Sequence, residues 1–453
     1  MANSYLTRTQ TAGNRRKGTF SAWVKRSALA YNYLISWNST ISGTSHGDWI
    51  RFNDNKLDVI KYTGSVVYRV QTNRLFRDPS AWYHIVVAYD SEQSTASNRI
   101  RIYVNGVEET SFDTSTYPSE DFDFQFNHNS IVACVGKNYN TEANFNGYMS
   151  HVAWVDGQQL APTVFGQTDS TSGIWKFKSP SGVTWGTNGF HLKMENSGAL
   201  GTDSSGESNT FTVNGDLKQA VDTPSNVFAT LNPLASLPNT GVSTFTNGST
   251  TSQGVNGSYV NGGSNLQMSS GKWYAECKYV ATSSDVGRMI IGITQDVSEI
   301  SRINQDTGSY NTYFNNYDGS GAKSVQGSNP SSYGNAYGIN DIIGIALDLD
   351  NEKLYFSING TWQNSGVPTS GSTGTGAITG FSSPSSSISG GYFFFSGSNS
   401  NAQNNTVSWN FGNGFFGTTA ITSAGSNGNG SLFEYDVPSG YYALNTKNIN
   451  TYG

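Results

Sequence analysis

Two stretches of the chain share a pattern that favours a β-hairpin. The segments 85–90 and 342–348 are apolar and end in Asp, and each leads through a polar turn and an alternating strand to an Asn-Gly pair, at 105–106 and 359–360. Alternation of apolar and polar residues is typical of a strand with one buried face, and Asn-Gly is a strong hairpin-turn signal. The sequence therefore predicts two halves of similar architecture, each an antiparallel β-sandwich with this hairpin at its centre.

The composition also favours β-structure. Charged residues make up 13% of the chain and aromatic residues another 13%, which differs from the charge-rich, aromatic-poor composition of disordered chains. Apolar residues do not recur at helical spacing over any long stretch. We expect an all-β chain with two antiparallel β-sandwich, jelly-roll-like domains in tandem, namely residues 1–200 and 222–453, joined by a linker or crossover at 201–221.

Charge and hydropathy narrow the classes of partner. A net charge of −6 argues against nucleic-acid binding. The basic residues Arg15, Arg16 and Lys17 form either a solvated N-terminal arm or an arm that docks onto an acidic partner. The first residues lack the apolar segment of a signal peptide, and no run approaches 18 apolar residues. We therefore expect a protein made in the cytosol that does not insert into a membrane.

Three acidic side chains, Asp348, Asp350 and Glu352, gather in the second hairpin. A Ca²⁺ site needs about six to eight oxygen ligands that converge from more than one loop. A carboxylate at a turn more commonly accepts hydrogen bonds from backbone N–H groups. We interpret this stretch as a structural hairpin and expect no metal and no cofactor. The two cysteines, Cys134 and Cys277, are expected to be small buried side chains without a disulfide.

Several motifs resemble known families. GKWYAECKY, MIIGITQD and YGINDIIGIALDLDNEKLYFSINGTW followed by GVP resemble a SPRY domain. NRRKGTFSAWVKRS, WYHIVVAYD, IYVNG and GYMSHVAWVDG resemble a laminin G-like or concanavalin A-like lectin domain. Together with DTPSNVFATLNPL and VPSGYYALNTKNI, they are similar to virion proteins of tailed bacteriophages. The resemblance implies two sandwiches, of which the SPRY type mostly binds proteins and the concanavalin A type often binds sugars, with some members that are glucanases.

Catalytic signals are weak. The glucanase branch carries an E-x-D-x-E type motif, because glycoside hydrolysis needs two carboxyl groups about 5–10 Å apart. The nearest stretch here, SEDFDF at 119–124, has its acids in another order. Motifs of serine hydrolases, zinc proteases and P-loop proteins are absent from the sequence. We therefore expect no catalytic residues and no enzymatic activity.

Binding of a sugar or protein needs aromatic rings and a few polar groups at accessible positions. The candidate binding residues are Trp37, Asp48, Trp49, Tyr310, Tyr313, Asn316, Tyr317, Asp318 and Trp362. Trp and Tyr also fill sandwich cores, so each candidate has a purely structural alternative.

We expect a virion surface protein, assembled in the host cytoplasm, that attaches to a host-surface glycan or protein as a tail-associated adhesin or a capsid-attached appendage. Its other expected partners are virion proteins and further copies of itself, as a homo-oligomer. The alternatives are a purely structural capsid-decoration (cement) protein and, less in keeping with the motifs, a glycan-degrading enzyme.

Overall fold

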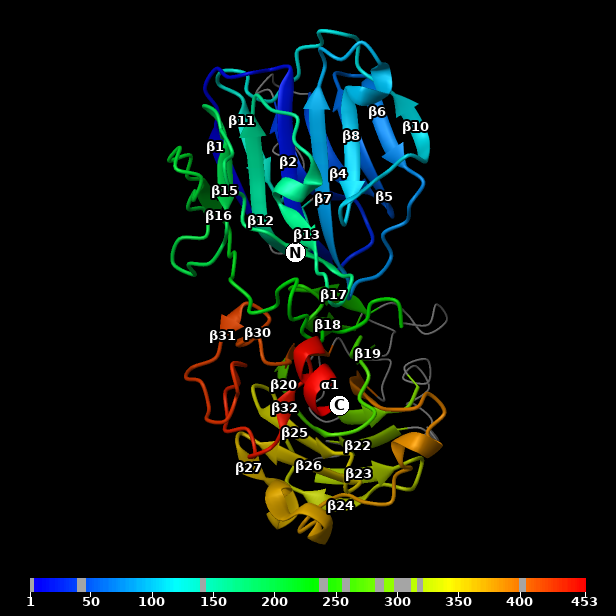
Figure 1. Ribbon diagram of the computed structural model, residues 1–453. Coiled ribbons are helices and arrows are strands. Elements are labelled where there is room, and N and C mark those ends of the chain that lie inside the picture. The colour runs from blue at the N-terminus through cyan, green and yellow to red at the C-terminus, as the bar shows by residue number, and fades with distance from the viewer. Residues whose placement is uncertain are drawn as a thin grey trace. The chain divides into compact units, whose positions relative to one another are not determined.

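The computed structural model describes residues 4–38, 46–138, 144–235, 243–254, 261–281, 289–296, 311–315, 321–398 and 405–453. The chain divides into two compact units, Met1–Gln219 and Ala220–Gly453, which Figure 1 colours from blue to green and from green to red. Each unit consists of antiparallel β-sheets around its own cluster of buried hydrophobic side chains. The all-β prediction is therefore confirmed.

Unit 1 is a sandwich of two sheets. The larger sheet contains, in order across it, β10 (Phe112–Thr116), β6 (Val66–Thr72), β5 (Lys56–Tyr62), β4 (Gly47–Asn53), β3 (Asn32–Asn38), β11 (Val132–Val135), β1 (Tyr5–Thr9) and β16 (Thr212–Asn214). The smaller sheet contains β15 (Phe190–Leu192), β12 (Gly147–Asp156), β2 (Lys17–Arg26), β7 (Trp82–Asp90), β8 (Ile100–Val104) and β9 (Val107–Glu108). Alternation along β2 directs Phe20, Ala22 and Val24 into the core between the sheets.

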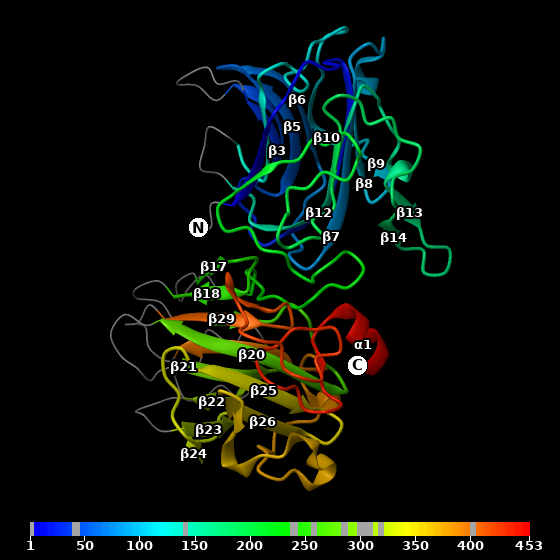
Figure 2. The ribbon, with the colours of Figure 1, turned by 90° about the vertical axis from the view of Figure 1, so that its left-hand side faces the viewer.

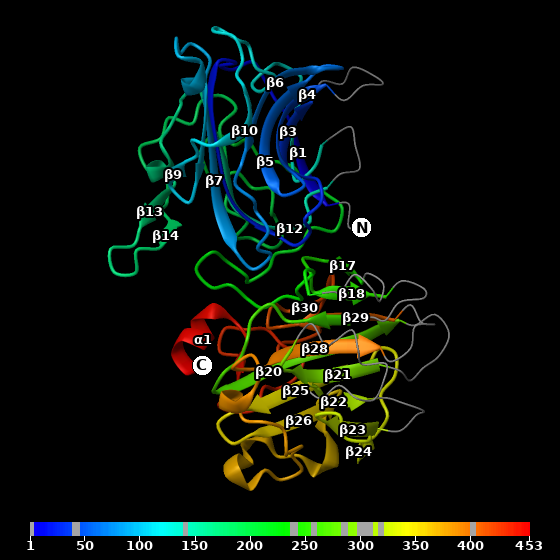
Figure 3. The same cartoon turned by 90° about the vertical axis from the view of Figure 1, so that its right-hand side faces the viewer.

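The remaining elements of unit 1 lie outside these two sheets. A separate two-stranded sheet is formed by β13 (Gly166–Thr168) and β14 (Trp175–Phe177). Figures 2 and 3 show this hairpin on the side of the smaller sheet that faces away from the larger one. Two short 3-10 helices are η1 (Ala96–Asn98) and η2 (Pro162–Val164).

Unit 2 is also a two-sheet sandwich. One sheet contains β17 (Thr244–Thr246), β18 (Thr251–Gln253), β29 (Thr406–Asn410), β20 (Lys272–Ala281), β25 (Ile342–Asp348), β26 (Lys353–Ile358) and β27 (Thr361–Trp362), with β32 (Tyr442–Ala443) pairing in parallel with β20. The other contains β19 (Asn261–Gly263), β28 (Phe393–Ser398), β21 (Met289–Thr294), β22 (Asn311–Asn315), β23 (Gly321–Val325) and β24 (Ser331–Gly334). The smaller elements are β30 (Phe415–Phe416), β31 (Thr419–Ala420), η5 (Gln363–Ser365), η6 (Pro368–Thr373), η7 (Pro384–Ser386) and α1 (Thr446–Tyr452).

The two units share one strand topology. The order β12-β2-β7-β8-β9 in unit 1 corresponds to β29-β20-β25-β26-β27 in unit 2, and the order β6-β5-β4-β3-β11-β1 corresponds to β24-β23-β22-β21-β28-β19. Corresponding strands also follow one another in the same order along the chain. The similarity that the sequence predicted for the two halves therefore extends over both sheets of each sandwich.

The matched hairpins agree at the level of single hydrogen bonds. Asn105 and Asn359 both adopt positive φ, 49° and 48°, and each is followed by a Gly that also has positive φ. The Asn105 side-chain oxygen accepts from the backbone N–H of His84 at 2.8 Å, and that of Asn359 accepts from Ile342 at 2.9 Å. Both hairpins lie toward one edge of their sheet, so the predicted central position is wrong.

The acidic residues of the second hairpin have structural roles. Asp348 is buried, and its carboxylate lies 2.9 Å from the Lys272 ammonium. The Asp350 carboxylate accepts from the backbone N–H of Gly271 at 2.8 Å. Glu352 occupies a left-handed position of the turn, with φ 57°. The prediction that this stretch is a hairpin is confirmed by the pairing of β25 with β26.

The expected linker at 201–221 belongs largely to unit 1. Strand β16 pairs with β1, and the Phe211 side chain enters the core of the sandwich. A three-residue strand carries almost no alternation signal, and its partner lies about two hundred residues earlier in the chain, so no local pattern indicated this pairing. The final strand of unit 1 is therefore β16, which lies beyond the expected domain end at residue 200.

The basic cluster near the N-terminus is not a free arm. Lys17 begins β2. The Arg16 guanidinium lies 2.9 Å from the Asp121 carboxylate, and the Lys17 ammonium lies 2.7 Å from that of Glu92. Most of this positive charge is thus paired within unit 1.

Cys134 and Cys277 are both buried and free, as predicted. In the described parts of the chain, no helix is both long and apolar enough to cross a membrane.

Candidate functional site

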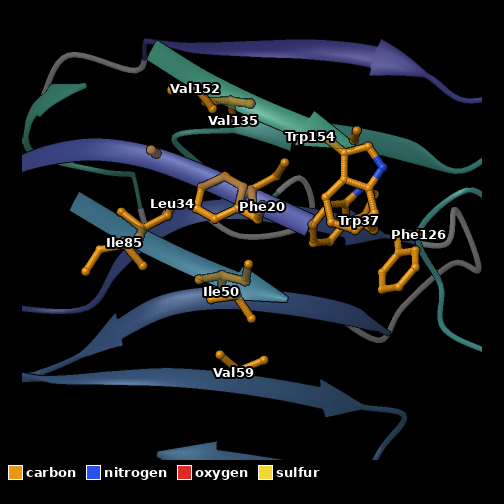
Figure 4. Close-up of a cluster of buried hydrophobic side chains, with 14 of the residues drawn as sticks. Phe20, Leu34, Trp37, Ile50, Val59, Ile85, Phe126, Val135, Val152 and Trp154 are labelled. Carbon is orange, nitrogen blue, oxygen red and sulfur yellow. The ribbon is translucent and has the colours of Figure 1, made fainter. Parts of the chain in front are cut away.

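Two of the candidate binding residues in unit 1 are core residues. The Trp37 ring is fully buried and packs against Phe126 and Trp154, with ring centroids 5.6 and 4.8 Å apart (Figure 4). Asp48 is also fully buried, where its carboxylate meets the Lys61 ammonium at 3.3 Å. A register shift between Tyr33 and Ile35 places Trp37 on the core face. The prediction that these side chains present an accessible surface is therefore wrong.

The candidates in unit 2 have different outcomes. Tyr310, Asn316, Tyr317 and Asp318 lie outside the described residues, so their role stays a prediction. Tyr313 belongs to β22 and not to a loop, and it packs with Ile290 and Phe395. Trp362 is half-buried on β27, with its ring 6.5 Å from those of Tyr274 and Tyr355.

Trp49 is part of an aromatic surface on the outer side of the larger sheet of unit 1. We call this surface the aromatic–arginine face, and it consists of Tyr31, Tyr33, Trp49, Arg51 and Tyr62. The Trp49 ring stacks on Tyr62 at 5.9 Å and meets the edge of Tyr33 at 5.8 Å. The Arg51 guanidinium lies 5.1 Å from the Tyr31 ring and 5.5 Å from those of Tyr33 and Trp49.

A carboxylate and a tyrosine hydroxyl hold the Arg51 guanidinium in place. One carboxylate, Asp58, receives both Arg51 at 2.9 Å and Arg69 at 2.8 Å. The Tyr33 hydroxyl accepts a further hydrogen bond from Arg51 at 3.0 Å. A guanidinium fixed by a carboxylate and stacked among rings is a rigid, planar group. Two guanidinium groups share one carboxylate, so this small cluster carries a net positive charge.

The accessible edge of the face is narrow. Tyr31 is 47% exposed, whereas Trp49 is only 5% exposed and donates its indole N–H to the Asn38 side-chain oxygen at 2.8 Å. Tyr62 is half-buried. Tyr31 and Tyr62 can therefore contact a ligand, and the buried rings support them. Tyr31, Tyr62 and Arg51 were not among the candidates selected from the sequence. The alternation along 47–53 and 56–62 was a usable signal for the outward-facing side chains of these two strands.

The same place in unit 2 is occupied by Tyr313. In β4, Trp49 precedes the core residue Ile50, and in β22 Tyr313 precedes the core residue Phe314. The pairing of β3 with β4 and that of β21 with β22 are equivalent in the shared topology. The two candidate rings selected from separate parts of the sequence are thus structural counterparts.

One pair of side chains in unit 1 superficially suggests nucleophilic catalysis. The Ser21 hydroxyl lies 2.9 Å from Nε2 of His84. A general base toward serine needs a free lone pair on that nitrogen, with a carboxylate accepting from the other nitrogen. Here the Trp175 indole N–H donates to Nδ1 at 2.9 Å. The neutral ring therefore carries its proton on Nε2 and donates a hydrogen bond to the Ser21 hydroxyl. This polarity is the reverse of the one that a general base toward serine requires.

A buried carboxyl group in unit 2 is similarly engaged. Glu276 accepts from the backbone N–H groups of Glu434 and Tyr435, both at 2.9 Å, and from Asn410 and Tyr274 at 3.2 Å. Burial raises the pKa of Glu276 to about 7, although these four donors act in the opposite direction. The carboxyl group ties the segment around 434 to strand β20, which is a structural task.

Comparisons with known proteins agree with this architecture. Residues 2–165 match the family model Laminin_G_3, described as the concanavalin A-like lectin/glucanases superfamily, and residues 272–394 match the SPRY domain model. No curated protein sequence matches the chain significantly.

Solved structures resemble parts of the chain at low identity. The SPRY domain of human HERC1 shares 13% identity, with 40% of this chain and 96% of that chain covered and a TM-score of 0.30. A native heptameric SAP-like pentraxin from Limulus polyphemus shares 13%, with 47% and 87% covered and a TM-score of 0.31. Stonustoxin shares 12%, with 40% and 28% covered and a TM-score of 0.28. On the two family matches, the chain carries a concanavalin A-like domain and a SPRY domain in tandem.

Proposed function

We propose that this chain is a non-enzymatic surface protein of a tailed-phage virion that attaches to a glycan or protein of the host surface. Both kinds of domain commonly bind ligands. The virion assignment is supported by the similarity of the combined sequence motifs to phage virion proteins. The aromatic–arginine face is the observation that carries the binding proposal.

The chemistry of that face suits a sugar. The apolar side of a pyranose stacks on an aromatic ring, while a guanidinium donates to hydroxyl or carboxylate oxygens. Tyr31 is the exposed ring, the Arg51 guanidinium lies 5.1 Å from it, and Arg69 shares the Asp58 carboxylate with Arg51. A ring contact contributes around 1 kcal/mol, so one copy binds weakly. Attachment at useful strength then depends on many copies that bind together.

The absence of catalysis is part of the proposal. Its support is the polarity of the Ser21–His84 pair and the four hydrogen bonds that engage Glu276. In the described portion of the chain, no three His, Cys, Asp or Glu side chains gather into a possible metal-binding group.

The test uses the full chain displayed on a multivalent particle, with binding to host cells and to an array of host-surface glycans as the readout. Tyr31→Ala combined with Tyr62→Ala is expected to lower binding at least about tenfold, which corresponds to about 1.4 kcal/mol from two rings. Tyr452→Ala removes an equally exposed tyrosine of unit 2 (44%) and is the matched control. Trp49→Ala is unsuitable, because loss of a buried Trp costs about 3–5 kcal/mol of stability.

Two results would contradict the proposal. One is that the displayed protein binds no host surface at any valency. The other is that virions without the protein adsorb at the normal rate but lose their DNA, which would identify a structural decoration protein instead.

A further inference from the structure

A segment of unit 1 covers the outer side of the smaller sheet. We call residues 157–189 the flap, which includes η2, β13 and β14. Figures 2 and 3 show β13 and β14 beyond β7 and β12, away from the larger sheet. Three of the five histidines of the chain, His84, His151 and His191, lie where the flap meets the sheet. This concentration of imidazoles at one contact surface needs an explanation.

Trp175 of the flap contacts His84, a ring that the sheet's own residues Ser21 and Trp23 also touch. The Trp175 indole N–H donates to Nδ1 of His84 at 2.9 Å, and the two rings stack at 6.0 Å. The Trp175 ring fits between two glycines, because a Cβ atom on Gly106 or Gly166 would lie 2.5 or 2.4 Å from it. Protonation of Nδ1 would place two donors face to face. The closed flap therefore requires a neutral His84.

The other two imidazoles contact the flap through ring faces. His151 stacks on Phe177 of the flap, with centroids 3.6 Å apart and the ring planes at 12°. His191 stacks on Trp185 of the flap at 5.8 Å. Nδ1 of His151 and Nε2 of His191 lie 3.3 Å apart, a distance at which one ring donates to the other. Two charged rings at this distance would repel each other.

Nearby carboxylates offset only a small part of the cost of protonating these rings. The charged groups that face these rings are Lys193, Glu195 and Asp203. The Asp203 carboxylate already accepts from the backbone N–H groups of His191, Ser205 and Asn209. In residues 4–38, 46–138 and 144–235, none of the three imidazoles hydrogen-bonds a carboxylate. Burial lowers the pKa of His84 to about 3 and that of His151 and His191 to about 4.

We propose that the flap is an acid-released latch, which stays closed while His84, His151 and His191 are neutral and opens when they take up protons. The open state exposes the rings to water, where a histidine titrates near pH 6.5. Because protons bind the open state more tightly, acid favours opening and neutral pH favours closure. Between pH 7.5 and 5.5 the opening equilibrium rises about tenfold for each imidazole released, and about a thousandfold for all three.

The test is hydrogen exchange of the full chain at pH 7.5 and 5.5, read by mass spectrometry and corrected for the intrinsic pH dependence. Peptides within 157–189 are expected to exchange at least tenfold faster at pH 5.5, whereas peptides covering β4 and β5 are unchanged. His151→Gln combined with His191→Gln removes two titrating groups and is expected to abolish about a hundredfold of the response. His128→Gln, at a half-buried histidine whose Nδ1 lies 2.8 Å from the Asn129 carbonyl oxygen and not against the flap, is the matched control and leaves the response intact.

The proposal is overturned if the flap peptides show no acceleration, or if the flap and the β4–β5 peptides accelerate together, because the latter indicates ordinary acid unfolding. It is also overturned if the double variant keeps the full response. Trp175→Phe provides an independent check, since it retains a ring but lacks the N–H that binds His84. This variant is expected to open more readily at pH 7.5 and to depend less on pH.

Discussion

The two Asn-Gly turns allow a test of why the sequence repeats them. Asn105 and Asn359 each hold positive φ. Their side-chain oxygens accept a hydrogen bond from a backbone N–H of the preceding strand, that of His84 and that of Ile342 respectively. Replacement by Gly permits positive φ but loses the side-chain acceptor, which costs about 1 kcal/mol. Replacement by Ala loses the acceptor and adds about 1 kcal/mol for a Cβ in the left-handed region. We therefore expect Ala to destabilise by about 2 kcal/mol.

The location of the effect is as informative as its size. Because each unit has its own core, Asn105→Ala should destabilise only unit 1 and Asn359→Ala only unit 2. Thermal unfolding, monitored by hydrogen exchange of peptides from each unit, shows which of the two units is destabilised. A loss of 2 kcal/mol corresponds to a fall of about 4–8 °C in the melting temperature of a unit of this size.

Asn→Asp at the same positions is the matched control, because Asp retains the acceptor oxygen and tolerates positive φ. These Asp variants should melt within about 2 °C of the native chain. If Asp destabilises as much as Ala does, the side-chain acceptor is not the reason for Asn, and the hydrogen-bond explanation of the repeated turn is refuted.

Three further predictions concern the boundary, a buried acid and the second hairpin. The free energy of unfolding in urea should be at least about 2 kcal/mol larger for residues 1–219 than for residues 1–200, because the shorter chain lacks β16 and the buried Phe211. Equal urea midpoints would argue against a unit boundary at residue 219. Burial raises the pKa of Glu276 in the folded chain to about 7. Its contribution to the stability of unit 2 is therefore present below about pH 4.5 and is lost as the pH rises toward 7. The urea midpoints at pH 5 and pH 8 should accordingly differ less in Glu276→Gln than in the native chain. Asp350→Asn combined with Glu352→Gln should change the melting temperature little and leave it insensitive to calcium, and calorimetry with calcium or a chelator would reveal a contrary response.

The sequence by itself determined the class of fold and much of its internal repetition. Alternation along β2 and β25 identified the core-facing side chains of these strands, such as Phe20 and Ile345. The Asn-Gly pairs located the matched hairpins, because only a few residues tolerate positive φ. These signals are local, so they can be read from neighbouring residues, and they extended to the similarity of the two units.

Only the tertiary structure decided which strands pair over long distances and what covers each face. The pairing of β1 with β16 joins segments about two hundred residues apart, and a register shift in β3 moves Trp37 into the core while Tyr33 stays outside. Alternation shows which side chains share a face, but both faces of the smaller sheet in unit 1 are covered. His84 is buried because Trp175, ninety-one residues later, lies against it. Burial of a sheet face depends on a distant segment, and no local pattern encodes that contact.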